Sequence, residues 1–238
     1  MIFIENIKEP SRFLECCKKF HELELRDIAY VVSWSLVARN PDDQSFVLAS
    51  AKLIIITWNI VQFQKLKTDI KLKLEDDILD AYNRSRDIFK KLRDKRLWEL
   101  DLDDDKLKND IKYIFHAFSS KKSIGITGAS KILHILNPYV FMMWDREIRQ
   151  AYHLLHNKDH EIGDEKCYLE FLKQSQMILK TLLTKTSEEE IWYKHSAILD
   201  KNFIKTFAFR ESILKMLDEC NYVKFSIRRK VKDTRSKI

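Results

Sequence analysis

Residues 121–149 read KKSIGITGASKILHILNPYVFMMWDREIR and hold two of the three glycines of a chain of 238 residues. Soluble proteins contain about 7% glycine on average, so backbone freedom is concentrated at Gly125 and Gly128. The apolar segment that follows them must end at Asn137-Pro138, because proline lacks an N–H and disfavours helical backbone in the preceding residue. The stretch therefore predicts a glycine turn, a short helix and a second break.

Two charged residues stand at the edges of these predicted helices. Lys131 is expected at the start of the helix that opens near Gly128, and Asp145 at the N-cap of the next helix, after an apolar, strand-like run to Trp144. An N-cap aspartate accepts hydrogen bonds from first-turn amides and stabilises a helix by about 1 kcal/mol. Capping alone would account for Asp145, and a solvated position on a helix would account for Lys131.

The order of glycine hairpin, lysine, short apolar helix, loop and aspartate resembles the helix-hairpin-helix DNA glycosylase superfamily, the endonuclease III and 8-oxoguanine glycosylase group. The resemblance implies that Lys131 is the nucleophile of strand-cleaving members and that Asp145 is the catalytic acid. It also implies that a hairpin at Ile124–Ala129 holds a DNA phosphate with backbone amides. The glycines lie three positions apart rather than two, and only 14 positions separate Lys131 from Asp145, so the resemblance is to a divergent member. The residues expected to contact DNA are Lys121, Lys122, Gly125, Ile126, Thr127, Gly128 and Ala129.

The chemistry of base excision explains why these residue types would be needed. A lysine amine can capture the sugar carbon as a Schiff base, and a carboxylate can stabilise positive charge on the sugar. The damaged base must leave the duplex and enter a pocket in which aromatic side chains stack on it. Candidate pocket residues are Trp34, Trp58, Asn59 and Trp144, although tryptophans with a hydrogen-bonded N–H also serve as core side chains.

Composition favours helix almost throughout, because glycine and proline are rare and Leu, Ile, Lys and Glu are frequent. We predict an all-α fold, a compact multi-helix bundle with a helix-hairpin-helix-like element. A single domain is expected over residues 1–223, with a junction near residues 118–122 if the bundle divides into two lobes. The helices are expected at about residues 11–21, 24–39, 45–65, 68–95, 105–118, 129–136, 146–157, 164–184 and 187–218.

The net charge of +7 is carried almost entirely by the C-terminus. Residues 224–238 contain seven Lys or Arg and one Asp, which leaves a balance of +1 for the rest of the chain. We expect this segment to be a basic tail, which either has no function or helps to hold a polyanion by displacing counterions.

Two sets of potential metal ligands stand out, and neither predicts a metal site. Asp103, Asp104 and Asp105 lack the glycine and the closing glutamate of an EF-hand loop. The second set is His153, His156 and His160 with Asp164, which share one helical face only if the helix runs unbroken past residues 157–159. No four-cysteine cluster for iron and sulfur lies near the C-terminus, and no metal or other cofactor is expected.

The remaining features concern location. Cys16, Cys17, Cys167 and Cys220 form no CxxC pair and predict buried, reduced thiols inside the cell. No signal peptide pattern is visible, and the longest apolar runs are shorter than the ~20 residues that span a bilayer. We expect a cytoplasmic protein, associated with the nucleoid if it binds DNA, without a membrane partner.

Three functions stay open on the sequence alone. A DNA base-excision glycosylase, with or without strand cleavage at the abasic site, requires Lys131 and Asp145 to face one pocket; its partner would be duplex DNA with a damaged base. A noncatalytic nucleic-acid-binding protein would keep the hairpin and point Lys131 to solvent. An all-helical interaction module would use its tryptophan-rich helices to bind protein.

Overall fold

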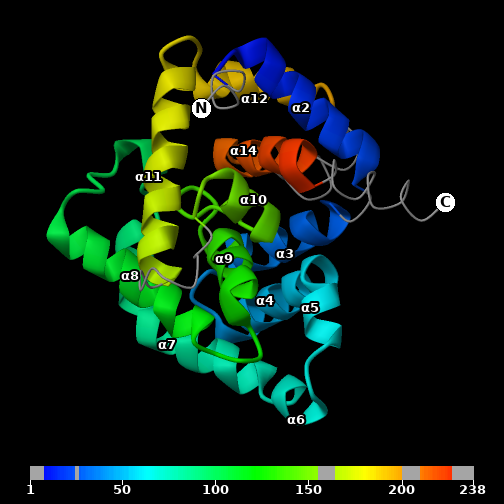
Figure 1. Ribbon diagram of the computed structural model, residues 1–238, viewed down its shortest axis with the longest axis vertical. Helices are drawn as coiled ribbons and strands as arrows, with labels where there is room; N and C mark the ends of the chain where they lie inside the picture. The colour runs from blue at the N-terminus through cyan, green and yellow to red at the C-terminus, as the bar shows by residue number, and fades with distance from the viewer. Residues whose placement is uncertain (1–7, 25–26, 155–163, 200–209, 227–238) are drawn as a thin grey trace.

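The structure is a computed structural model that describes residues 8–24, 27–154, 164–199 and 210–226. Within these ranges it consists of helices, turns and extended loops without a strand, which confirms the all-α prediction (Figure 1). The α-helices are α2 (Pro10–Leu23), α3 (Asp27–Arg39), α4 (Gln44–Trp58), α5 (Ile60–Gln64), α6 (Thr68–Lys71), α7 (Leu74–Leu92), α8 (Asp105–Ser119), α9 (Gly125–Leu136), α10 (Arg146–Ala151), α11 (Asp164–Leu183), α12 (Glu188–Ser196) and α14 (Ile213–Asn221). A 3-10 turn, η1 (Leu97–Glu99), and a π-helical turn, η2 (Tyr222–Ser226), complete the described elements.

Helix α9 lies inside the bundle and carries the decisive stretch. It packs against α4 on one side and α8 on another, while α3 packs on both α4 and α9. Figure 1 shows α9 and α10 near the middle of the molecule, with α7 and α8 below them and α11 running alongside. Residues of α9 such as Ala129, Ile132 and Leu133 are fully buried, so the short apolar helix is a core element.

The two ends of the described chain meet. Helix α2 packs against α12 and α14, and η2 packs against α2 and α10 (Figure 1). Phe13 and Phe20 of α2 and Leu217 of α14 are all fully buried. The C-terminal helix therefore forms part of the core and contacts the first described helix.

Side-chain caps explain where several helices begin. Asp104 Oδ1 accepts a hydrogen bond of 2.8 Å from the amide of Leu107, and Asp145 Oδ1 accepts one of 2.8 Å from the amide of Ile148. Ser187 Oγ accepts a hydrogen bond of 3.0 Å from the amide of Glu190. These caps confirm the starts predicted for α8, α10 and α12.

Three long helices predicted from the sequence are interrupted in the structure, and the one expected over residues 68–95 divides at the turn of residues 72–73 into α6 and α7. The helix expected over residues 45–65 breaks at Asn59, whose backbone (φ −118°, ψ 18°) ends α4 and starts α5. The helix expected over residues 187–218 is wrong as well, because α12 ends at Ser196 and α14 begins after Ser212, whose backbone is extended. The apolar patterns of all three continue past the breaks, so periodicity alone joined separate helices.

Other expectations from the sequence have clear outcomes. All four cysteines are buried. No described helix combines the length and the apolar character that crossing a bilayer requires. The chain stays helical through Ser226, three residues into the segment expected to be a tail, and residues 227–238 lie outside the described part.

Candidate active site

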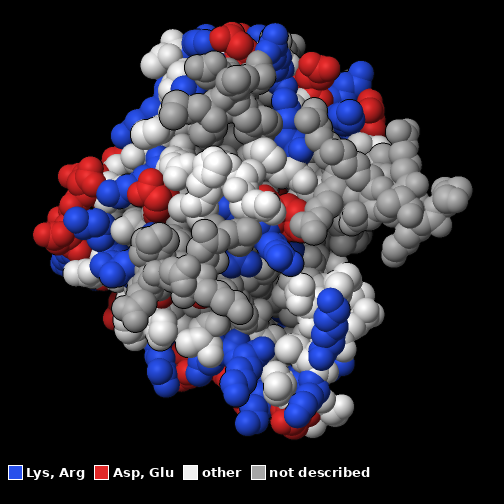
Figure 2. Space-filling view, in the orientation of Figure 1, with Lys and Arg blue, Asp and Glu red and all other residues white. Residues whose placement is uncertain are grey.

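A cavity of about 900 Å³ opens between five parts of the chain. Its walls come from the end of α4 with α5, the first turns of α9, the start of α10, the end of α14 and η2. Figure 2 shows Lys and Arg side chains gathered beside α10 and over α5 and α6 on the face that these helices share. The residues that carry its chemistry are Trp58, Asn59, Lys122, Lys131, Asp145 and Asp218.

Lys131 and Asp145 both line this cavity, as a Lys/Asp pair requires. The Lys131 side chain is half-buried, and its Nζ donates a hydrogen bond to the carbonyl oxygen of Trp58, the last residue of α4. A helix C-terminus is the negative end of the helix dipole, so this position holds the lysine amine at the cavity wall.

The position of Lys131 within its helix differs from the prediction. Helix α9 begins at Gly125 rather than near Gly128, so Lys131 is its seventh residue and lies in the second turn. The expected hairpin at Ile124–Ala129 is likewise wrong in its bounds, because the turn occupies residues 120–124 and Gly125–Ala129 are helical. The sequence predicts that both glycines belong to one turn, whereas in the structure they have different roles.

Gly125 and Gly128 are required for different reasons. Gly125 has a φ of +67°, a left-handed conformation that glycine adopts without steric cost, and it joins the turn to α9. Gly128 has no such requirement. A Cβ at its position would lie 2.9 Å from Ile55 Cδ1 and 3.4 Å from Asn59 Nδ2, so a glycine here lets α9 approach α4.

Asp145 is held on both of its carboxylate oxygens. Oδ1 caps α10, and Oδ2 accepts a hydrogen bond of 2.7 Å from the hydroxyl of Ser226 in η2. Hydrogen bonds from α10 and η2 therefore fix the orientation of the carboxylate. It lies at the N-terminus of α10, where the helix dipole favours negative charge.

A second carboxyl group, Asp218, lines the same cavity and was not predicted from the sequence. Its side chain is almost fully buried in α14, and burial raises its pKa to about 8; the ammonium of Lys215 opposes this rise, and the carboxylate of Asp145 adds to it. At neutral pH the group is mainly the protonated acid. An aspartate among the apolar residues Leu214, Leu217 and Cys220 is the feature of the sequence that could have indicated a buried carboxyl group. The helix expected over residues 187–218 ends at this aspartate, so burial was not predicted.

The four candidate pocket residues separate into three locations. Trp58 and Asn59 line the cavity, with exposed fractions of 9% and 7%. Trp144 reaches the cavity wall, but only 1% of it is exposed and its ring stacks on Phe171 at 5.5 Å between centroids. Trp34 does not belong to this site, because it lines a separate cavity of about 200 Å³ between α3, α7 and the end of α9, beside Tyr82.

The basic residues near the turn differ in how their charges are used. Lys121 lies outside the cavity lining, and its Nζ contacts Asp80 Oδ2 at 2.6 Å and Asp77 Oδ1 at 3.9 Å. Lys122 is exposed and lines the cavity, as does Arg146 of α10. The structure therefore leaves Lys122, rather than Lys121, as the turn lysine at the cavity.

Neither set of metal ligands considered from the sequence forms a site in the described chain. Asp103 pairs with Lys173 at 2.5 Å, Asp105 pairs with Lys108 at 2.7 Å, and Asp104 caps α8. Of the second set, His156 and His160 lie outside the described residues, and α10 already ends at Ala151, before His153. The acidic run is thus a helix start with exposed ion pairs.

The chain was compared with protein families, curated proteins and solved structures. No family model, no curated protein and no solved structure matches the chain. The chemistry of the cavity follows from its own residues.

Proposed function

We propose that this protein is a DNA glycosylase that removes a damaged base and cleaves the resulting abasic site with Lys131 as its nucleophile. The observation that carries the proposal is that Lys131 and Asp145, which lie on different helices, line one cavity together with the protonated acid Asp218. An amine, a fixed carboxylate and a carboxylic acid are the groups that attack at the sugar carbon, stabilise positive charge and transfer a proton.

The roles follow from the position of each group. The Lys131 amine would attack the sugar carbon as the bond to the base breaks, and the base would leave with that bond's electrons. Loss of the amine proton to water and opening of the sugar ring would give a Schiff base; loss of a proton from the neighbouring carbon would then expel the phosphate and cut the strand, and water would hydrolyse the Schiff base to free the lysine. Asp145 would stabilise the positive charge that develops on the sugar, since both of its oxygens are held in place. Asp218, as a buried acid, would donate a proton to the departing base.

The amine of Lys131 must be neutral to act as a nucleophile. Its present hydrogen bond to the Trp58 carbonyl stabilises the protonated form, so binding of the substrate would have to displace it. A flipped base that enters beside Trp58 would lie next to the hydrogen bond between Lys131 and the Trp58 carbonyl.

A phosphate site fits the start of α9. This helix has no side-chain cap at Ile124, and its next residues, Ile126 and Thr127, line the cavity. Helix N-termini bind phosphate through backbone amides and the helix dipole. Lys122 and Arg146 would supply the accompanying positive charge, which would allow a nearly neutral body to bind DNA at this site.

The hydrogen bond between Lys131 and Trp58 favours a second candidate, a protein that binds DNA at the same surface without catalysis. In that case Lys131 would be a cation that contacts the DNA, and the cavity would bind a base or a phosphate without chemical change. The two candidates share the DNA-binding surface and differ only in covalent chemistry.

Borohydride trapping distinguishes them. The full chain would be incubated with duplex oligonucleotides that carry an abasic site or 8-oxoguanine, beside Lys131→Ala, Asp145→Asn and the exposed control Lys166→Ala. We expect a covalent adduct that Lys131→Ala abolishes and Lys166→Ala retains. Asp145→Asn should preserve the helix cap, since asparagine also caps well, and slow base release.

Other results would decide against catalysis. Salt-dependent DNA binding without an adduct, with base release absent from the wild type, would leave the noncatalytic candidate. If the chain neither binds DNA nor forms an adduct, the glycosylase proposal and its alternative both fail, and an interaction module becomes the better account.

A further inference from the structure

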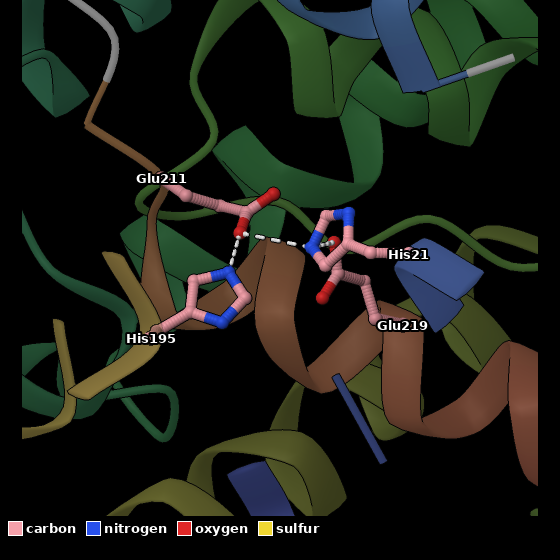
Figure 3. Close-up of side chains that lie close together, drawn as sticks. All are labelled: His21, His195, Glu211 and Glu219. Atoms are coloured by element: carbon pink, nitrogen blue, oxygen red, sulfur yellow. Dashed lines mark hydrogen bonds and ion pairs between the residues drawn. The ribbon is translucent and has the colours of Figure 1, made fainter. Parts of the chain in front are cut away.

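Four side chains with metal-ligating atoms meet where the two ends of the described chain pack together. Figure 3 shows His21 of α2, His195 of α12, Glu211 just before α14 and Glu219 of α14 turned toward one another. One ligating atom from each lies within 4.8 Å of all the others. His195, Glu211 and Glu219 are at most 2% exposed, so the cluster belongs to the interior.

The separations suit a single ion. His21 Nε2 lies 3.3 Å from Glu219 Oε1 and 4.0 Å from Glu211 Oε2, while His195 Nε2 contacts Glu211 Oε2 directly. Ligands about 2.0–2.2 Å from a tetrahedral zinc ion lie roughly 3.3–3.6 Å from one another. The four ligand atoms lie within 4.8 Å of one another, so the longest separations would shorten as the side chains turn toward an ion.

The charges of the cluster require compensation. Lys215 Nζ lies 2.6 Å from Glu219 Oε1, 3.1 Å from Asp27 Oδ1 and 3.5 Å from Glu211 Oε1. With neutral imidazoles, three carboxylates and one ammonium leave a charge of −2 in a buried region, which is costly unless it is balanced. One divalent cation, or protonation of both histidines, supplies that balance.

Details of the surroundings favour the ion. His21 Nδ1 faces Asp27 Oδ2 at 3.5 Å, the arrangement in which a carboxylate orients a histidine that binds metal through its other nitrogen. Glu219 Oε2 is buried and has no hydrogen-bond partner among the described residues.

We propose that His21, His195, Glu211 and Glu219 bind one divalent transition-metal ion, zinc being the expected occupant. Nitrogen and carboxylate donors suit zinc, and four protein ligands leave no open position, so the ion is structural. It would fasten the first described helix to α12 and α14. Glu219 is adjacent to Asp218, so the ion would also fix the helix that lines the candidate active site. Metal binding by these four residues is independent of the proposed DNA chemistry.

Metal content of the full chain tests this directly. The protein would be purified with its affinity tag removed, dialysed against zinc and then against metal-free buffer, and measured by plasma mass spectrometry. We expect about one zinc per chain in the wild type and in His116→Gln, an exposed histidine of α8. His195→Gln and Glu219→Gln should each lose it.

A second measurement needs no variant and protects the test from misfolding. Zinc at about 100 times its Kd should raise the Tm of the metal-free wild type by ~5–10 °C, whereas magnesium should not. Cobalt in place of zinc should give the visible absorption of a tetrahedral ion. Zinc retained equally by both cluster variants, or wild type that holds no zinc and shows no zinc-dependent Tm, would overturn the proposal and leave a network of protonated histidines.

Discussion

The hydroxyl of Ser226 donates a hydrogen bond of 2.7 Å to Asp145 Oδ2, across 81 residues of sequence. The contact joins η2 to the N-cap of α10 and fixes the carboxylate of Asp145, which lines the same cavity as Lys131. The last described residue of the chain thereby takes part in the candidate active site.

Removing this contact should slow base release, because one of the two hydrogen bonds that orient the Asp145 carboxylate is lost. A hydrogen bond to a charged acceptor contributes about 1.5–3 kcal/mol, and about 1.4 kcal/mol corresponds to a tenfold change in rate. We therefore expect Ser226→Ala to slow base release by at least ~10-fold in single-turnover assays. Ser196→Ala, which removes a local hydrogen bond to Tyr193, is the control and should leave the rate unchanged. Equal rates for Ser226→Ala and wild type would show that the contact does not position Asp145 for catalysis.

The buried acid Asp218 predicts a pH dependence of stability. Its pKa is about 8 in the folded chain, against an ordinary value of 3.8. Between these values the folded chain holds a proton that the unfolded chain has released, so stability falls as the pH rises, by up to about 1.4 kcal/mol per unit. The stabilising contribution is complete below about pH 4 and lost by about pH 8.

Asp218→Asn should remove this dependence, because asparagine has a similar shape and does not titrate. Urea unfolding from about pH 5 to 8 would then show a shallower fall for Asp218→Asn than for the wild type, by up to ~1 kcal/mol per unit. Asp76→Asn, on the exposed side of α7, should behave as the wild type does. Parallel pH profiles for the wild type and Asp218→Asn would mean that Asp218 is charged in the folded chain.

The positive φ of Gly125 predicts a backbone cost for other residues. A Cβ at Gly125 would meet no atom within 4 Å, so any loss of stability in Gly125→Ala comes from the backbone alone. Left-handed conformation costs an L-residue about 1–3 kcal/mol, and asparagine tolerates it better than alanine. Chemical unfolding should rank glycine above asparagine and asparagine above alanine. Equal stability of all three would contradict the left-handed turn.

The two turn lysines should differ in their contribution to DNA binding. Each lysine that neutralises a phosphate adds about 0.9 to the slope of log K against log salt. Lys122→Ala should reduce that slope by about 1, because Lys122 lines the cavity. Lys121→Ala should leave it nearly unchanged, because Asp80 and Asp77 already pair with its ammonium. The reverse ranking in fluorescence anisotropy titrations would place the DNA on another surface.

The sequence by itself determined the features that depend on neighbouring residues. Asp145 caps α10 and Ser187 caps α12 because a side-chain oxygen reaches amides only two or three positions away. Apolar spacing likewise predicted helices throughout, and the stop at Pro138 confined α9 to the residues before it. These are short-range effects of backbone geometry and hydrogen bonding.

Tertiary structure alone decided which of these residues meet. Because α4 ends at Trp58, the carbonyl oxygen of Trp58 can accept a hydrogen bond from the Lys131 amine. The apolar periodicity of the sequence does not predict that contact. The pKa of Asp218 is raised because packing removes its carboxyl group from water. His21 and Glu219 approach to 3.3 Å because α2 and α14 share the core, although 198 residues separate them. Burial and long-range packing decide such encounters, and the local pattern of a sequence does not record them.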